Sequence, residues 1–440
     1  MRRLIYIFII GLLLCSYTWA DGSRYASKSL LSEGKWVKIR VDKTGIYKLS
    51  YADLKNMGFS DPSKVSVHGY GGWPLDEDFS KEYIDDVPST PVWRGSDYLL
   101  FYGKGPVKWE YDSSSQTFVH TNNPYSLYGY YFVTDATPTN DMTSVAQASG
   151  ASTRITTYDD YLLHEQELVS VNQSGREFFG EDFSGARPRT ISTFSSIPGI
   201  TDADGKVTMR FISRINSGSG TASLSINDSE LLDITIPSIQ TVSSNVRSYT
   251  KAIPGTTTAL WKGSKSEKNN VVVSYSSSGH TNVRLDYIRM QFVRTLRPYG
   301  ACTFFRSLTS VGNASRFVIS EANSNTLVFD VTDALNVKRV EADLNGSELS
   351  FTIPAGRLRE FVLVQTNQTF PSPEVVGEVA SSNLHGLEQR DMIIISAPSL
   401  VQQAERLAVA HREKDGLTVE VVTPEAIYNE FSSGTPDATA

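Results

Sequence analysis

Short stretches in which apolar and polar residues alternate recur along most of the chain. In KWVKIRV, residues 35–41, large apolar side chains alternate with Lys38 and Arg40. A period of two buries one face of a β-strand and exposes the other. Aromatic stretches of similar character follow at 97–112 (DYLLFYGKGPVKWEYD) and 128–135 (YGYYFVTD). The pattern predicts a chain built mainly of β-strands.

One short helix is expected inside this first β region. The turn Asp42–Gly45 should lead into a return strand, as in a hairpin. A helix should then begin at Ser50 as N-cap, with Asp53 in the capping-box position and Gly58 as its stop. Residues 64–72 (KVSVHGYGG) predict another strand and a glycine-rich bend.

Two further β regions are expected. Between residues 156 and 297, many short strands are divided by Gly, Asn, Ser and Pro, which predicts a two-sheet sandwich or jelly roll. Residues 298–388 predict a smaller β domain that ends in a linker, TNQTFPSPEVVGEVASSN (366–383), because that stretch has several Pro and Gly breaks and few large apolar residues.

The periodicity changes after the linker. Met392–Ser396 is a continuous apolar run, typical of a strand covered on both faces. A helix should follow, with Ser399 as N-cap, Gln402 closing a capping box and Gly416 as its stop. The apolar face of this helix comprises Val401, Ala404, Leu407 and Ala408.

A second strand, Leu417–Val422, should lie parallel to the first, with a right-handed crossover. Pro424 then opens a second helix at its favoured first position, and Gly434 ends it. Two parallel strands need further neighbours and cover on both faces. We therefore expect 389–440 to be the first β-α-β unit of a truncated domain.

The predicted fold class is mainly β, with sandwich or jelly-roll and smaller β domains, followed by the truncated start of an α/β domain. The expected parts are a signal peptide, an N-terminal β-rich domain, a β-sandwich, a small β domain with linker, and the β-α-β unit, at residues 1–20, 21–155, 156–297, 298–388 and 389–440.

Composition limits the class of protein. The 440 residues are 40% hydrophobic and 20% charged, a globular balance. A net charge of −7 gives no reason to expect nucleic acid as a partner. Arg2 and Arg3 precede an apolar run that ends in a small-residue cleavage pattern at Ala20, which predicts an exported protein. Cys15 leaves a lipoprotein alternative open, which Leu14 disfavours because a small residue is expected there.

Several residues could carry chemistry, and for most the structural interpretation is preferred. Cys302, alone once the leader is removed, could be a nucleophile but fits a small buried hydrophobe better. Residues 201–207 (TDADGKV) resemble a calcium loop, yet a hairpin turn at Asp204–Gly205 is preferred. Residues 164–167 (HEQE) offer metal ligands but are expected to be solvated charges. His68 is expected to be structural.

The aromatic groups within 128–133, 109–112 and 71–74 could stack on sugar rings, but core and cross-strand packing is preferred. In SGREFFGEDF (174–183), Arg176 and Glu177 could form a buried ion pair at a domain junction.

Six stretches together resemble the gingipain family of secreted bacterial cysteine peptidases, and most of all the surface sortase of the type IX secretion system of Bacteroidetes. They are spread over nearly the whole mature chain and lie at residues 45–59, 97–112, 123–135, 174–183, 404–423 and 425–440.

The resemblance implies a caspase-like catalytic domain whose Cys nucleophile and His base lie beyond Ala440 and form an acyl-enzyme with the substrate. No catalytic residue can be assigned within the chain: Cys302 precedes the α/β unit, and His411 lies on its first helix. Ala397–Pro398 and Thr423–Pro424, which follow the two strands, would at most border the site. The fragment itself is expected to be inactive, without cofactor or metal.

The implied partners are cargo proteins with C-terminal sorting domains, other type IX secretion components and anionic lipopolysaccharide, at the outer membrane or cell surface. Two alternatives remain at this stage. One is a secreted β-sandwich module that binds glycan or protein without catalysis. The other is a purely structural role, in which the β regions dock to outer-membrane partners.

Overall fold

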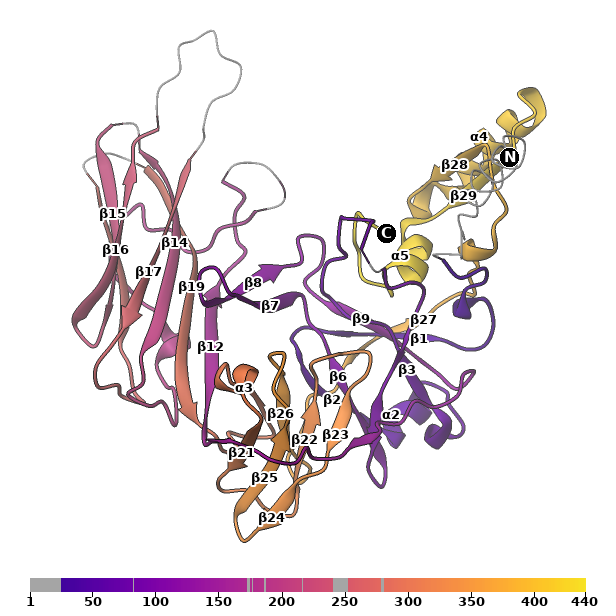
Figure 1. Cartoon of the computed structure of the whole chain (residues 1–440). Coiled ribbons are helices and arrows are strands. Elements are labelled where there is room, and N and C mark those ends of the chain that lie inside the picture. Colours follow the sequence, from indigo (N-terminus) through magenta and orange to yellow (C-terminus); the bar gives the residue numbers. More distant parts are fainter. Residues whose placement is uncertain are drawn as a thin grey trace, which may run out of the picture. The chain divides into compact units, whose positions relative to one another are not determined.

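The computed structural model describes residues 25–440 apart from 82, 172–174, 176, 186, 216, 240–251 and 278–280 (Figure 1). The expected signal peptide, with Cys15, lies outside these residues. Contacts divide the chain into two units: unit 1 is 1–107, 125–141 and 371–440, and unit 2 is 108–124 and 142–370. The domain boundaries expected from the sequence stay predictions.

Unit 1 contains three sheets. The five-stranded sheet has the order β27 (Glu374–Glu378), β1 (Val37–Val41), β9 (Gly129–Thr134), β3 (Ser66–His68) and β4 (Ser89–Thr90). The three-stranded sheet has the order β2 (Gly45–Ser50), β6 (Tyr98–Gly103) and β5 (Val92–Arg94). The third sheet is the pair β28 (Met392–Ile395) and β29 (Val419–Val422).

The local signals around Ser50 are confirmed. Helix α2 (Tyr51–Asn56) has Ser50 as N-cap and a complete capping box with Asp53, and Gly58 has a φ of 90°. The expected hairpin is wrong, because β1 pairs with β9 and β27 whereas β2 pairs with β6. The turn at Asp42–Gly45 therefore carries the chain from one sheet to another.

The predicted linker contains a strand. β27 pairs antiparallel with β1, with an irregularity between Lys38 and Ile39. Its two valines, Val375 and Val376, are about half exposed, at 48% and 50%. Because half-exposed valines at a sheet edge give only a weak apolar signal, the composition of this stretch did not predict a strand.

Unit 2 contains the expected sandwich, whose layers appear as the magenta strands in Figure 1. Its buried core joins the two sheets through residues such as Met209, Phe211, Leu224 and Val273. One sheet has the order β12 (Thr157–Glu165), β19 (Thr281–Thr295), β14 (Gly205–Ile215) and β17 (Ile253–Trp261). The other has the order β13 (Arg189–Thr190), β18 (Val271–Ser277), β15 (Ser219–Ile226) and β16 (Ser229–Pro237), and η3 spans Ser192–Phe194.

The rest of unit 2 is also β. The hairpin strands are β7 (Val107–Asp112) and β8 (Thr117–Asn122). One sheet comprises β10 (Ser144–Val145), β23 (Lys338–Val340), β22 (Thr326–Asp330), β26 (Phe361–Gln365) and β20 (Cys302–Phe305). Another comprises β11 (Thr153–Ile155), β21 (Ser315–Ile319), β25 (Glu348–Ile353) and β24 (Asp343–Asn345), and α3 spans Thr309–Gly312. Stacked and edge-on phenylalanines, Phe305, Phe317, Phe351 and Phe361, fill the core of these two sheets.

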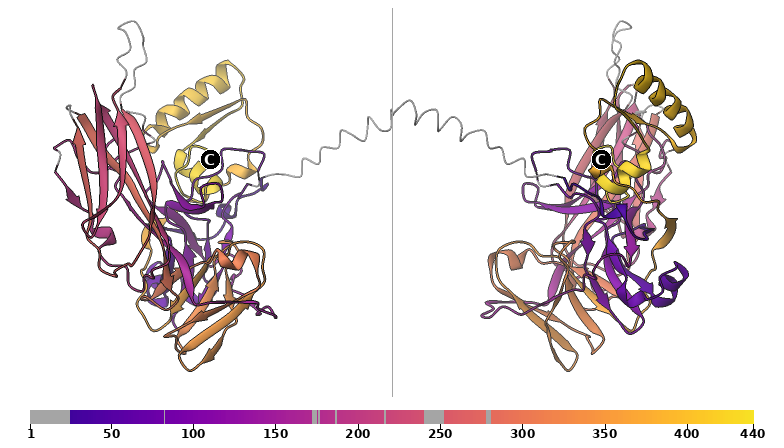
Figure 2. Two further views of the ribbon diagram at one scale, coloured as in Figure 1. Left: turned by 60° about the vertical axis from the view of Figure 1, so that its left-hand side comes forward. Right: turned by 90° about the vertical axis from the view of Figure 1, so that its right-hand side faces the viewer.

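The C-terminal part of unit 1 is the expected β-α-β unit. β28 and β29 are parallel, and helix α4 (Val401–Lys414) connects them and packs on β29 (Figure 2). Gly416, with a φ of 68°, follows the helix as predicted. The predicted capping box at Ser399 is wrong: the turn η5 (Pro398–Leu400) precedes the helix, and Leu400 occupies the N-cap position without a side-chain bond.

The apolar run of β28 is only partly covered. Ile393 and Ile395 are 59% and 62% exposed, and Leu407 on α4 is 49% exposed. Within the described residues this apolar run lacks cover on both faces, as expected for two parallel strands without further neighbours. Helix α5 (Pro424–Phe431) follows β29, with Thr423 as N-cap and Pro424 at the first position, as predicted.

The remaining short turns of unit 1 are 3₁₀-helices, η1 (Leu30–Ser32), η2 (Pro62–Lys64) and η4 (Leu384–Gly386). In the part of the chain that the structure describes, no helix is long and apolar enough to cross a membrane.

Candidate functional site

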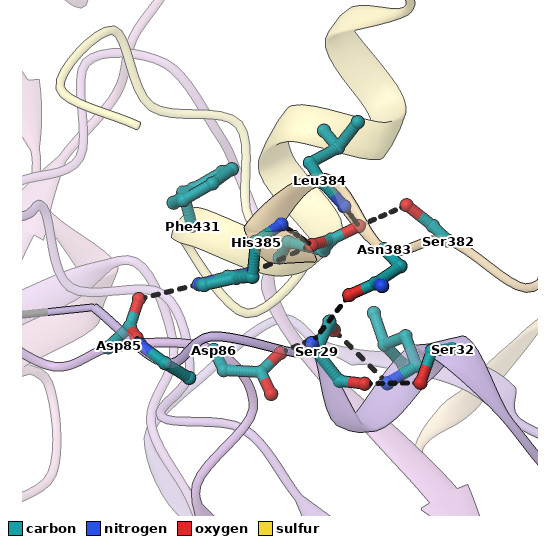
Figure 3. Close-up of polar contacts among 12 residues, drawn as sticks. Ser29, Ser32, Asp85, Asp86, Ser382, Asn383, Leu384, His385 and Phe431 are labelled. Atoms are coloured by element: carbon teal, nitrogen blue, oxygen red, sulfur yellow. Dashed lines mark hydrogen bonds and ion pairs between the residues drawn. The ribbon is translucent and has the colours of Figure 1, made fainter. Parts of the chain in front are cut away.

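A buried polar cluster in unit 1 joins segments that are far apart in the sequence. His385, on η4, lies between Asp85 and Glu430, and Ser29 and Asn383 extend the network (Figure 3). The side chains of His385 and Glu430 are fully buried. Buried charges are costly unless they are paired, so this cluster strongly constrains how its segments meet.

Helix α5 places Glu430 in the cluster. The Thr423 hydroxyl accepts a hydrogen bond from the Ala426 amide and caps the helix, and Glu430 lies near its C-terminal end. The Glu430 carboxylate accepts hydrogen bonds from the Ser382 hydroxyl and from the amides of Leu384 and His385, at 2.8 and 3.1 Å for the two amides. These amides begin η4, and the first amides of a helix have no partner within it. Glu430 therefore acts as the cap of η4.

The imidazole of His385 is bonded on both nitrogens. Nδ1 lies 2.7 Å from Glu430 Oε2, and Nε2 lies 2.8 Å from Asp85 Oδ1. The ring of Phe431 stacks on it, with centroids 4.4 Å apart and an interplanar angle of 18°. Since a carboxylate can only accept, both ring nitrogens must donate, and His385 is an imidazolium.

The charges around His385 determine its pKa. Burial lowers the pKa, but the hydrogen bonds to Glu430 and Asp85 and the charges of Asp85 and Asp86 outweigh it and raise the pKa to about 9. For Glu430, burial raises the pKa, but the bonds from His385, Ser382 and the η4 amides bring it below its usual value. The cluster thus holds a charged His–Glu pair at neutral pH.

Asp86 ties the N-terminal segment to the same cluster. Its carboxylate accepts from the Ser29 hydroxyl at 2.8 Å and from the Leu30 amide at 2.7 Å. The Ser29 amide in turn donates to Asn383 Oδ1 at 2.9 Å. Burial raises the pKa of Asp86 above its usual value although these bonds oppose the shift.

The segment that begins with α5 is also bonded to the five-stranded sheet. Lys38 on β1 donates to Asn429 Oδ1 at 2.8 Å, and the Tyr130 amide on β9 donates to Thr435 Oγ1 at 3.1 Å. Burial lowers the pKa of Lys38 to about 8, against the opposing charge of Glu425. These bonds are polar and buried, so they specify one position of the segment.

The cluster suits positioning and not catalysis. His385 is fully buried, and both of its nitrogens are already bonded to carboxylates of the chain. A general base needs a nitrogen within reach of a substrate proton. Among the described residues, no group of three or more His, Cys, Asp or Glu side chains could hold a metal ion.

The candidate nucleophile and base lie apart from this cluster. Cys302 is half-buried on β20, opposite Val364. His411 on α4 pairs with Asp415 at 2.6 Å on the helix surface. Ala397–Pro398 and Thr423–Pro424 follow β28 and β29, as predicted.

Two sequence interpretations in unit 2 are wrong. Gly205 begins β14, whose neighbours are β17 and β19, so Asp204–Gly205 is a loop before a strand and not a hairpin turn. The second, that HEQE holds solvated charges, is wrong for His164 and Glu165, whereas Glu167 is exposed as expected. His164 bonds to Glu181 at 2.7 Å and Glu165 lies 3.2 Å from His120, with side chains at most about one-seventh exposed. Paired charges inside a sheet look like solvated charges in the sequence because their partners are distant.

The structural interpretation is confirmed for His68 and for three of the aromatic side chains. His68 is buried, and its nitrogens bond to the Val87 carbonyl and the Thr137 hydroxyl at 2.9 and 2.8 Å. Tyr131 and Phe132 are buried in unit 1, and Trp109 stacks on Tyr161 in unit 2. Arg176 lies outside the described residues; Glu177 pairs with Arg210 at 3.2 Å.

Sequence reasoning missed His385, Asp85 and Glu430. His385 stands in a linker-like stretch, and no motif surrounds it. Glu430 falls on the buried side of an amphipathic helix, where a carboxylate is unexpected. That mismatch was the one local signal that could have drawn attention to it.

Comparison with known proteins places these observations in a family. Residues 385–440 match Peptidase family C25. The chain is similar to the crystal structure of dimeric latent PorU from Porphyromonas gingivalis, with 36% identity and a TM-score of 0.86 over 95% of this chain. It spans 40% of that PorU chain. No curated protein matches the sequence.

Two other solved structures have TM-scores too low to carry an argument. The insecticidal delta-endotoxin Cry8Ea1 of Bacillus thuringiensis gives 0.21 at 9% identity, over 57% of this chain and 54% of that one. A cycloisomaltooligosaccharide glucanotransferase of Paenibacillus sp. gives a TM-score of 0.15 at 10% identity, over 50% of this chain and 48% of that one.

On the match of its C-terminal residues and the PorU-like fold of nearly its whole length, the chain belongs to the gingipain family of cysteine peptidases, peptidase family C25.

Proposed function

We propose that the chain is the N-terminal, non-catalytic part of a PorU-like surface sortase. The observation that supports it is the combination of a C25 match that begins at His385 with PorU-like structure over 95% of the chain. The activity would be cleavage of C-terminal sorting domains from exported cargo, followed by attachment of the cargo to the cell surface. The partners would be that cargo, other type IX secretion components and anionic lipopolysaccharide.

The half-covered β28–β29 pair supports a catalytic domain that continues past these strands. A parallel sheet is normally covered on both faces and has several strands. Ile393 and Ile395 leave a broad apolar surface on β28. Additional strands and helices of a complete C25 domain would cover it.

The catalytic step would be carried by residues outside this chain. A Cys thiolate would attack the peptide carbonyl, and an amine or hydroxyl acceptor would resolve the acyl-enzyme. In open α/β sheets the site lies at the carboxyl ends of the strands. Ala397–Pro398 and Thr423–Pro424 occupy those ends here. The part of this chain would be to place β28, β29 and α5 relative to the N-terminal β sheets.

The test uses the natural protein together with all residues encoded after Ala440. We expect a downstream α/β continuation with a Cys and a His, and thiol-dependent removal of a sorting domain from a cargo protein. Replacement of the downstream Cys by Ala should abolish cleavage without unfolding the protein. A coding sequence without such a continuation, or a full-length protein that leaves the cargo intact, would refute the proposal.

The alternative of a glycan-binding sandwich has no observation in its favour. Of the aromatic side chains that could have stacked on sugar rings, Tyr131 and Phe132 are buried in unit 1.

A further inference from the structure

The pairing of His385 with Asp85 connects the start of the C25 match to a loop of the N-terminal β region. We propose that Asp85 is a positioning residue that acts through protonated His385: together they form a clasp that holds α5 in place and opens when the imidazole loses its proton. The effect of the clasp on the proposed active-site edge rests on the proposed function, whereas the clasp itself involves only residues of this chain.

The geometry requires the proton. Both ring nitrogens face carboxylate oxygens, at 2.7 Å to Glu430 and 2.8 Å to Asp85. In a neutral imidazole, one nitrogen carries a lone pair, which would point at an oxygen lone pair. A neutral His385 would therefore lose one of the two bonds and leave a buried carboxylate without its charged partner, which is strongly unfavourable.

The groups that face His385 from each packed element favour the charged form. The 83–86 loop contributes the bonded carboxylate of Asp85 and the charge of Asp86, and α5 contributes Glu430. The Tyr83 hydroxyl, on the same loop, donates to the Phe431 carbonyl. The N-terminal segment contributes Tyr25, whose ring lies 5.5 Å from that of Tyr83 and 6.4 Å from that of Phe431. Two carboxylates, Glu430 and Asp85, thus bond the imidazolium directly, and Asp86 adds a third negative charge nearby; Figure 3 shows the bond between His385 and Asp85.

Opening of the clasp would change the position of α5, and through it the carboxyl end of β29. Glu430 lies two helical turns from Thr423, where β29 ends and α5 begins. On the other side of the cluster, the Tyr83 hydroxyl donates to the Phe431 carbonyl at 2.7 Å, and the Ser433 hydroxyl donates to the Asp86 carbonyl at 3.0 Å. The loop around Asp85 therefore holds the end of the helix whose start borders the proposed active-site edge.

The experiment is NMR on the 440-residue chain with ¹⁵N-labelled histidine and backbone amides, titrated from pH 6 to 10.5. We expect both His385 ring nitrogens to be protonated at pH 7 and one proton to leave near pH 9. The amides of Ser432 and Gly434 should shift with the same midpoint. Asp85→Asn should lower the midpoint by about one unit or more, because one opposite charge at contact distance is removed.

The matched control is Asp415→Asn, which removes the carboxylate partner of the surface histidine His411. It should leave the His385 midpoint and the amides of Ser432 and Gly434 unchanged. A singly protonated His385 at pH 7 would overturn the proposal, and wild-type protein alone suffices to see it. Amides of Ser432 and Gly434 whose chemical shifts do not follow the His385 titration would also overturn the proposal. Since no activity is measured, either result is independent of the fate of the proposed function.

Discussion

The buried Arg306 guanidinium forms a bidentate ion pair with the partly buried Glu360 carboxylate in unit 2. Arg306 Nε lies 2.5 Å from Glu360 Oε2, and a second bond joins the other guanidinium nitrogen to Oε1. The guanidinium also donates to the Asp159 carbonyl at 2.9 Å and lies 4.3 Å from the centre of the Tyr161 ring. Arg306 thereby connects strand β20 with strand β12 of the sandwich.

Replacing Arg306 should strongly destabilise unit 2. Arg306→Met keeps most of the volume but leaves the partly buried Glu360 without its partner, and we expect a loss of about 3 kcal/mol, the low end for a broken buried pair. Urea unfolding followed by the fluorescence of Trp109, which stacks on Tyr161, would measure it. Arg154→Met is the control: its pair with Glu348 is exposed, so we expect a change below about 1 kcal/mol. Equal effects of the two variants would contradict the role of Arg306.

Only one of the two predicted capping boxes exists, and mutation can separate them. Ser50→Ala should cost about 1 kcal/mol, because the Ser50 hydroxyl accepts from the Asp53 amide at 3.0 Å. Ser399→Ala should have little effect, since Leu400 holds the N-cap position of α4. Urea midpoints of the two variants would decide. A larger loss for Ser399→Ala would show that the sequence pattern, and not the described cap, is right.

The stability of unit 1 should fall as pH rises from about 6.5 to 9. The pKa of His385 is raised to about 9 in the folded chain. A histidine whose pKa is raised by folding stabilises the folded state fully at pH values below its pKa in the unfolded chain, ~6.5. This stabilisation, at most about 3 kcal/mol, is lost as the pH rises through the pKa in the folded chain. Urea midpoints between pH 6 and 9.5 should show the decline.

His385→Asn is the control for this pH dependence and should remove the decline. Lys38 contributes in the opposite sense above pH 8, because its pKa is lowered by burial and folding is favoured when it is neutral. The difference between wild type and His385→Asn isolates the histidine. Parallel pH profiles for the two proteins would contradict the assignment.

The exposed face of β28 should make the 440-residue chain self-associate. Ile393→Ser with Ile395→Ser removes two largely exposed apolar side chains, so the monomer should become more soluble at little cost in stability. Light scattering during size-exclusion chromatography would measure it. Leu344→Ser, at an isolated exposed leucine on β24, is the control and should change nothing. Unchanged self-association of the double variant would show that the association surface lies outside β28.

Local signals predicted the elements well. The strand around Lys38, the capping box at Ser50 and Pro424 at the start of α5 each depend on residues within one or two turns, and all three are present. The exposed face expected at Lys38 is wrong, because Lys38 is buried. The family resemblance had the same basis, because its stretches are contiguous. One failure was also local: Ser399 has the right neighbours for a cap, but Pro398 forms a 3₁₀ turn there instead.

The close backbone contacts at Gly72 and Gly129 could not be predicted from local sequence signals. The sequence predicts a bend at the GYGG stretch, but not that a Cβ on Gly72 would lie 2.8 Å from the Gly129 Cα, or that one on Gly129 would lie 2.0 Å from the Lys104 carbonyl. Three loops meet there backbone to backbone, and only glycine permits such an approach.

The sequence by itself determined most of the strands and helices, although not β27, and the family to which the chain belongs, because periodicity and caps are contained in a few neighbouring residues. The tertiary structure alone decided that β1 pairs with β9 and not with β2, that Lys38 reaches Asn429, and that His385 lies between Asp85 and Glu430. These contacts join residues up to 391 positions apart. Their energy comes from burial and charge pairing in the folded chain, which no local pattern records.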